Sequence, residues 1–143
     1  MEVLVSPFEM RDYPVALALW KSTEGVGLSS ADESAAIEAF LLRNPSLSFK
    51  ATIDGQLVGT ILCGDDGRRG LIHHLVTAES HRRCGVAKAL LQNGLRALRG
   101  AGIEKCHLLV FKSNGVGVAF WRGVGAQERV TLSIFSIATL AGS

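Results

Sequence analysis

Residues 71–98 read LIHHLVTAESHRRCGVAKALLQNGLRAL, and this stretch decides the fold. Its first six residues form an apolar run with a β-branched member, which predicts a buried strand. From residue 86 onward, apolar residues recur at the spacing of one helix face, which predicts a helix. A strand therefore passes into a helix through a short basic turn.

The turn between this strand and this helix has the composition of an anion site. Basic residues surround a step of small residues in which Gly85 and Ala87 are separated by one position. The first amides of a helix have no partner within the helix, and small side chains let an anion approach them. The sequence therefore predicts a phosphate-binding loop. Its members are Arg82, Arg83, Cys84, Gly85, Val86, Ala87 and Lys88.

The order Arg82-x-x-Gly85-x-Ala87, after a strand and at a helix start, resembles the acyl-CoA pyrophosphate loop of the GNAT N-acetyltransferase family. The segment 58–60, Val-Gly-Thr, is similar to the family's third strand, and residues 114–125 are similar to its late helix. The resemblance covers most of the chain from about residue 49. It implies an α/β fold, the GNAT acyl-CoA N-acyltransferase fold. That fold has a mixed, mostly antiparallel sheet, helices on both faces, and splayed fourth and fifth strands.

Composition indicates an ordinary globular protein. The 143 residues, 48% hydrophobic and 20% charged, predict one N-acetyltransferase domain over residues 1–143. Short apolar runs and an acidic start predict a cytoplasmic protein without a membrane partner. The three cysteines form no Cys-x-x-Cys pair, so neither a disulfide framework nor a metal site is expected. A net charge of +2 does not indicate a nucleic-acid partner.

Outside the central stretch, periodicity and turn residues predict the other elements. In chain order these are a strand over 2–6, a helix ending near Thr23, a helix capped by Ser30 with Glu33, strands over 47–53 and 56–63 joined at Asp54-Gly55, a strand over 105–111, a short helix after Asn114, and a last strand over 129–137. Residues 64–70 are expected to form a charged loop. That loop is either a solvated hairpin end or a second recognition element.

The resemblance also implies how acetyl-CoA, as co-substrate, would be held. Leu75, Val76 and Thr77 would supply main-chain contacts to the pantetheine arm, and the Val76 amide would face the thioester oxygen. Asn114 would contact the CoA arm from the other side; the alternative interpretation is a helix cap, and both can be true. Trp121 stands where many family members carry a tyrosine that protonates the CoA thiolate, and an indole N–H is not a usable acid.

An amine acceptor must lose a proton before it attacks. Deprotonating a lysine-type amine at pH 7 costs about 4 to 5 kcal/mol, so a base is useful. His73 falls where arylalkylamine N-acetyltransferases carry a proton-relaying histidine. The alternative, favoured for His74, is a hydrogen-bonded core histidine. As neighbours on a strand, the two should point to opposite faces, so at most one should line the cleft. Glu24, acting through water, is a second candidate base.

Two functions are consistent with these patterns. The first is an N-acetyltransferase that transfers an acetyl group from acetyl-CoA to a primary amine by direct attack in a ternary complex. The second is a catalytically weak or inactive acetyl-CoA-binding module, which Trp121 favours. The acceptor, a small molecule or a peptide, should be selected by residues 24–28 and the loop around Asp66. The resemblance leaves a homodimer open as an alternative to a monomer.

Overall fold

Antiparallel pairing of successive strands builds most of the sheet in the computed structural model, which describes residues 2–140. The strands lie across the sheet in chain order: β1 (Leu4–Pro7), β2 (Phe49–Ile53), β3 (Gln56–Asp65), β4 (Gly70–Thr77) and β5 (Cys106–Leu108). β5 pairs with β4 in parallel, whereas the other neighbouring pairs are antiparallel. The prediction of a mixed, mostly antiparallel sheet is confirmed.

The turn between β2 and β3 forms as its residues predict. Asp54 and Gly55 both have left-handed backbone angles, with φ of 50° and 78°. Positive φ at both central residues is typical of the two-residue turn that matches the twist of a hairpin. This local geometry sets the pairing of β2 with β3 at Ile53 and Gln56.

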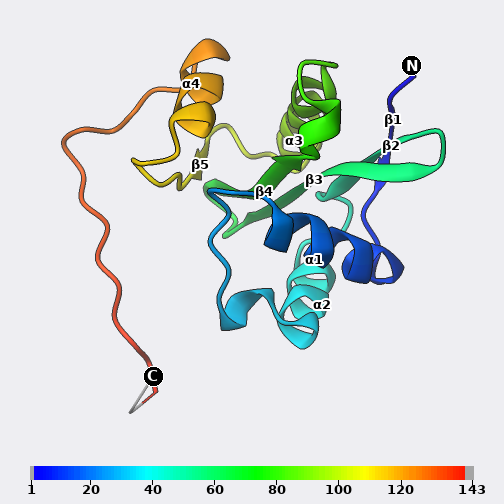
Figure 1. Ribbon diagram of the computed structural model, residues 1–143. Helices are drawn as coiled ribbons and strands as arrows, with labels where there is room; N and C mark the ends of the chain where they lie inside the picture. Colours follow the sequence, from blue (N-terminus) through cyan, green and yellow to red (C-terminus); the bar gives the residue numbers. More distant parts are fainter. Residues whose placement is uncertain (1, 141–143) are drawn as a thin grey trace. The chain divides into compact units, whose positions relative to one another are not determined.

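Helices cover both faces of the sheet (Figure 1). They are α1 (Tyr13–Ser22), α2 (Ser34–Arg43) and α3 (Val86–Gly100). A further helix, α4 (Gly115–Gly123), follows later in the chain. α3 lies on one face, and α1 and α2 lie on the other (Figure 1). Trp20 of α1 is fully buried in a cluster with Ile37 of α2 and with Val76 of β4. This cluster is the core of the α1–α2 face.

Two neighbouring residues of β3 show how the faces divide. A Cβ on Gly59 would meet Val86 and Leu90 of α3, so this position faces α3. The hydroxyl of the next residue, Thr60, bonds to the indole of Trp20 on α1. Successive side chains of a strand alternate between faces. The absence of a side chain at Gly59 therefore lets α3 pack closely on the sheet.

By its internal contacts the chain divides into two units, Met1–Val110 and Phe111–Ser143, and each is described by itself. The first holds the sheet and the helices α1, α2 and α3. The second holds α4 and the segment after it. The single domain expected from the sequence stays a prediction.

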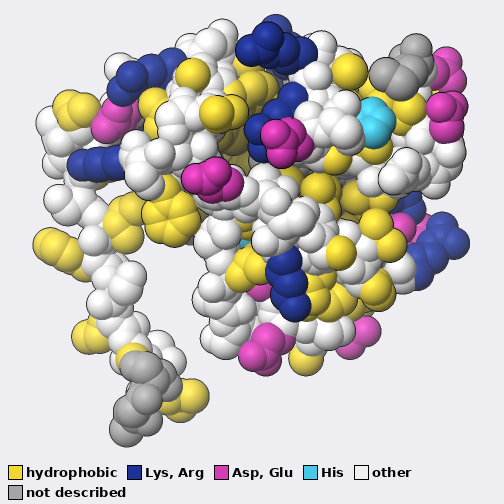
Figure 2. Space-filling view, viewed as in Figure 1, with side chains coloured by type: hydrophobic (Ala, Val, Ile, Leu, Met, Phe, Trp, Pro, Cys, Tyr) yellow, Lys and Arg dark blue, Asp and Glu magenta, His cyan; other side chains and the backbone are white. Residues whose placement is uncertain are grey.

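Three expectations about individual elements are wrong. Residues 129–137 form no strand: their apolar side chains are exposed and stand out as yellow atoms along the segment in Figure 2. Alternation indicates a strand only where a partner strand supplies hydrogen bonds. The strand expected over 105–111 shortens to Cys106–Leu108. The capping box is formed by Ser29 and Asp32, not by Ser30 and Glu33, and it opens a 3-10 turn before α2.

No helix within residues 2–140 combines the length and the apolar composition needed to cross a membrane. The cytoplasmic location and the homodimer stay predictions.

Replacing Gly59 with alanine should destabilise the protein. The added methyl group would lie 2.9 Å from the carbonyl oxygen of Val76 and from a Val86 side-chain carbon, so the backbone of β4 or helix α3 must move. Overpacking of this kind costs about 1 to 3 kcal/mol. Chemical denaturation should show the loss. Gly100→Ala is the control, because a Cβ there meets nothing within 4 Å. Equal stability of the two variants would contradict the packing described.

Candidate functional site

The turn that leads into α3 presents free main-chain donors. Gly85 caps the helix in a left-handed conformation with φ of 79°. Within the described chain, no hydrogen-bond acceptor is found for the amides of Val86, Ala87 and Lys88. Unpaired amides at a helix start carry partial positive charge and attract anions. A Cβ at Gly85 would meet no atom within 4 Å, so the space beside this turn is open.

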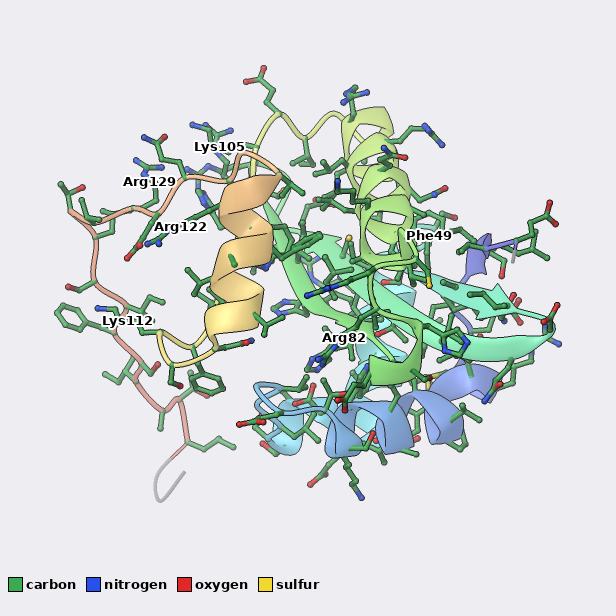
Figure 3. All side chains as sticks on the ribbon, turned by 45° about the horizontal axis from the view of Figure 1, so that its top comes forward. Phe49, Arg82, Lys105, Lys112, Arg122 and Arg129 are labelled. Carbon is green, nitrogen blue, oxygen red and sulfur yellow. The ribbon has the colours of Figure 1, made fainter. Side chains whose placement is uncertain are left out.

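Basic side chains add to these donors. Arg82 lies between β4 and α3 (Figure 3), with Arg83 next to it and Lys88 in the first turn of the helix. In the part of the chain that the structure describes, none of the three has a carboxylate at ion-pair distance. Cys84 is exposed, and its thiol contacts the carbonyl oxygen of Arg82 at 3.7 Å. The structure thus places the predicted phosphate-loop residues in one turn, and the basic side chains among them have no carboxylate partner in the described chain.

β4 has an open edge next to this turn. Its pairing with β5 ends at Ile72 and Leu108, so its later residues, 73–77, have no β5 partner. This opening corresponds to the splay expected between the fourth and fifth strands. Among residues 2–140, the Thr77 hydroxyl is buried without a hydrogen-bond partner. A buried polar atom of this kind is ordinarily satisfied by a bonded group, and here it lies at the end of the open edge.

The pairing with β3 fixes which amides of β4 face the opening. The Ala78 amide donates to the Val58 carbonyl oxygen at 2.8 Å, so Ala78 faces β3. In an antiparallel ladder the hydrogen-bonded residues alternate, so the Val76 amide also faces β3. The amides of Leu75 and Thr77 therefore face the open edge. The expectation that the Val76 amide meets the thioester oxygen stays a prediction, and this alternation favours the neighbouring amides for that contact.

A bulge in β4 reverses the expected arrangement of the two histidines. The register with β3 shifts between Thr60 and Leu62, and His74 has a left-handed φ of 45°. The Thr60 hydroxyl donates to the His74 carbonyl oxygen at 2.8 Å and accepts from the Trp20 indole at 2.9 Å. An extra residue in a bulge interrupts the alternation of side chains. Both His73 and His74 therefore line one cavity, contrary to the expectation of at most one.

His74 is held by a carboxylate that the sequence did not single out. Its Nε2 lies 2.6 Å from Oδ1 of Asp32, and its ring lies against Trp20 with centroids 4.4 Å apart. The other Asp32 oxygen accepts the Ser29 amide at 2.9 Å. Both members of the His74–Asp32 pair are largely buried, at 12% and 14% exposure. The Ser29-x-x-Asp32 spacing could have pointed to Asp32 in the sequence. An aspartate that caps a turn with one carboxylate oxygen can still bond another residue through its second oxygen.

Burial favours the neutral form of His73. Burial lowers its pKa below the usual histidine value, and the neighbouring His74 lowers that pKa further, while Asp32 opposes the shift. Its ring packs edge-on against Phe40 of α2 at a centroid distance of 5.7 Å. A buried neutral imidazole can accept a proton, which suits the base role expected for this residue.

Two cavities adjoin on the α1–α2 face. The inner cavity, of about 110 Å³, is bounded by Asp32, Phe40, His73 and His74. The outer cavity, of about 390 Å³, shares Phe40 and His73 with the inner one and extends to the loop between β3 and β4. His73 therefore borders both spaces. Glu24, the other candidate base, is exposed and lines neither of them, so its role stays a prediction.

The expected CoA contacts Asn114 and Trp121 belong to the second unit. Asn114 caps α4, since its side chain accepts from the Gly117 amide at 3.0 Å. The interpretation of Asn114 as a helix cap is confirmed, and its contact with CoA stays a prediction. Trp121 packs edge-on against Phe120 at 5.2 Å, and its part in a CoA site is likewise untested.

No group of three or more His, Cys, Asp or Glu side chains among residues 2–140 is arranged to hold a metal ion.

Comparison with known proteins identifies what this arrangement resembles. The family model described as "Acetyltransferase (GNAT) family" matches residues 13–126. The chain is 32% identical to an acetyltransferase of Photorhabdus laumondii over 129 residues, which cover 90% of this chain and 88% of that protein. Ard1 from Thermoplasma volcanium has a similar fold, with a TM-score of 0.78, 20% identity, and coverage of 87% and 82% of the two chains. A predicted acetyltransferase with acetyl-CoA from Clostridium acetobutylicum has a TM-score of 0.74, 18% identity, and coverage of 94% and 96%.

Replacing Thr60 with valine should loosen the bulge and lower stability. Valine has nearly the same shape but leaves the Trp20 indole and the His74 carbonyl without their buried partner. Each unsatisfied buried group costs about 1 to 3 kcal/mol. Denaturant unfolding should register the loss, and near-ultraviolet circular dichroism should report a changed Trp20 environment. Thr60→Ser, which keeps the hydroxyl, is the control and should stay closer to the wild type. If valine and serine behave alike, the hydroxyl bridge is not a structural constraint.

Proposed function

The chain belongs to the acetyltransferase (GNAT) family, and from this premise we propose that it transfers an acetyl group from acetyl-CoA to a primary amine by direct attack in a ternary complex. The family assignment makes the protein an acyltransferase. The proposal adds the donor, the acceptor class and the route. The observation that carries it is the open edge of β4, with the phosphate loop at one end and the two histidines at the other.

The donor side fits an acyl-CoA. The amides of Val86, Ala87 and Lys88, with the Arg82 and Arg83 side chains, would hold a diphosphate at the start of α3. The amides of Leu75 and Thr77 would pair with the amide groups of a pantetheine arm along the open edge, as an added strand pairs with a sheet.

Acetyl-CoA would supply a thioester whose carbonyl carbon the amine attacks and from which the thiolate leaves. Negative charge then develops on the carbonyl oxygen, and an amide that faces the opening can stabilise it. The direction of the β4 ladder favours the amide of Leu75 or Thr77 for this role over that of Val76. A CoA-like thiol has a pKa of about 8.5. The thiolate can therefore leave even though Trp121 stands where a general acid would protonate it.

The acceptor side fits an amine that loses a proton on arrival. Asp32 brings a carboxylate to the inner cavity, and a carboxylate attracts an ammonium group. His73 is the neutral imidazole beside it and can take the proton as the nitrogen attacks. Because His73 also borders the outer cavity, it can pass that proton to solvent. The His74–Asp32 hydrogen bond keeps the carboxylate in position.

A measurement of turnover distinguishes this proposal from the alternative of an inactive acetyl-CoA-binding module. Both functions require acetyl-CoA to raise the melting temperature of the protein. Catalysis alone releases free CoA thiol when an amine is added. A panel of amines that produces no thiol above background would leave only the binding function.

Arg82→Ala should weaken acetyl-CoA binding, because a charge-assisted contact to the diphosphate contributes about 1.5 to 3 kcal/mol. Gly85→Leu should weaken it more, since leucine disfavours the left-handed φ of 79° and fills the open space. Isothermal titration calorimetry measures both. Arg96→Ala, on an exposed position of the same helix, is the control and should bind as the wild type does. Unchanged affinity in both test variants would contradict the assignment of the diphosphate site to this turn.

His73→Ala should lower kcat and change its pH profile. The wild-type rate should fall as the pH decreases through the lowered pKa of His73, because protonation removes the base. The variant should lack this acidic limb and lose about 10²-fold to 10⁴-fold in rate, the usual contribution of a general base. Rates measured from pH 5 to pH 9 at saturating acetyl-CoA would show it. An acidic limb that persists in the variant would assign the titration to another group.

A further inference from the structure

Hydrogen bonds order the loop between β3 and β4, which borders the outer cavity. The Asp66 carboxylate accepts the amides of Arg68 and Arg69, both at 2.8 Å. The Asp65 carboxylate accepts the Gly67 amide at 2.8 Å, and the Asp65 amide donates to the Asn44 side chain at 3.1 Å. These bonds tie the loop to the end of α2. Residues 66–69 of the loop are exposed, and a role in recognition stays a prediction.

The acidic groups of the outer cavity accept hydrogen bonds within the loop, and the Arg69 guanidinium donates to the Arg68 carbonyl oxygen at 3.3 Å. Hydrogen bonds from the Arg69 and Arg68 amides hold the pKa of Asp66 below its usual value, so its charge is already stabilised by the loop. Arg43, at the end of α2, and Arg69 both line the cavity. Neither has a carboxylate partner at ion-pair distance within residues 2–140. The cavity therefore offers more hydrogen-bond donors than it uses.

The outer cavity lies at a fixed distance from the reacting end of the site. Gly70, which lines it, and His73, which borders both cavities, are three residues apart on β4. At about 3.3 Å per residue this separation is about 10 Å along the strand. An extended peptide covers the same distance in about three residues. A carboxylate on the third or fourth residue of a peptide could therefore reach the two arginines while its amino group lies beside Asp32 and His73.

We propose that the outer cavity binds a carboxylate of the acceptor through Arg43 and Arg69, and that the acceptor is the amino terminus of a peptide with an acidic side chain at its third or fourth residue. The acetyl transfer itself rests on the function proposed above, whereas the binding preference does not. The inner and outer cavities share Phe40 and His73 and therefore lie next to each other, and two guanidinium groups without a carboxylate partner among residues 2–140 supply the charge. Arginine is suited to this role because its planar fork holds a carboxylate through two hydrogen bonds.

Calorimetric titration of the full chain with ten-residue amidated peptides tests the preference without requiring turnover. Three peptides differ at residue four alone, which is glutamate, glutamine or lysine. The glutamate peptide should bind about tenfold more tightly than the glutamine peptide, the difference expected for a two-bond arginine contact. The lysine peptide should bind most weakly. Raising the salt concentration should reduce the preference, because both arginines are exposed.

Variants assign the preference to the cavity. Arg43→Gln and Arg69→Gln should each reduce it, and the double variant should remove it, leaving the glutamate and glutamine peptides within about twofold. Arg68→Gln is the matched control: Arg68 lies in the same loop, its side chain is 83% exposed, and it does not line the cavity. The control should keep the wild-type preference. Circular dichroism confirms that each variant is folded.

The outcomes separate this inference from the proposed function. Equal binding of the three peptides, tighter binding of the lysine peptide, no detectable binding, or loss of the preference in the Arg68 variant alone would each overturn the inference. If small amines are acetylated in any of those cases, the acetyl transfer still stands. Selective binding of the glutamate peptide without thiol release on addition of acetyl-CoA would uphold the inference and count against catalysis.

Discussion

The hydroxyl of Thr60 is the interaction on which the site depends. It joins the Trp20 indole of α1 to the His74 carbonyl of β4 in the buried interior, with Thr60 and Trp20 both fully buried. Water is excluded there, so neither partner can find a substitute without exposing the core. The bridge thereby holds a left-handed residue in the middle of a strand, a conformation that costs free energy unless its surroundings enforce it. Two adjacent histidines face one side as a result.

The same bulge separates the two sides of the proposed reaction. Beyond it, the Val76 side chain is buried in the α1–α2 core, while the amides of Leu75 and Thr77 face the open edge. The start of α3 then provides anion donors where β4 ends. The proposed proton transfer lies on the opposite side, where Asp32 and His73 line one cavity. A single irregularity in one strand therefore lets donor and acceptor approach the same opening from different directions.

Short-range patterns predicted the parts of the fold that short-range forces determine. The Asp54-Gly55 turn and the helix that begins at Val86 follow from backbone preferences of nearby residues, and both were found. The bulge at His74 was not predictable, because it depends on Thr60 and Trp20, which lie 14 and 54 positions earlier in the chain. The strand predicted from the apolar alternation over 129–137 is absent for the same reason. A strand requires a partner strand, which the local pattern does not contain.

This difference bears on how such a site can change its acceptor. The donor residues lie within one continuous stretch, where a substitution disturbs a turn that backbone geometry already fixes. The acceptor side is assembled across the chain, as the Asp32–His74 bond between residues 42 positions apart shows. Of its charged members, Asp32 lies in the 3-10 turn before α2, Arg43 at the end of α2, and Arg69 in the loop between β3 and β4. The two arginines are exposed, so their positions accept substitutions with little effect on the core. The acceptor side can therefore acquire a new charge pattern while the fold keeps its acyl-donor half unchanged.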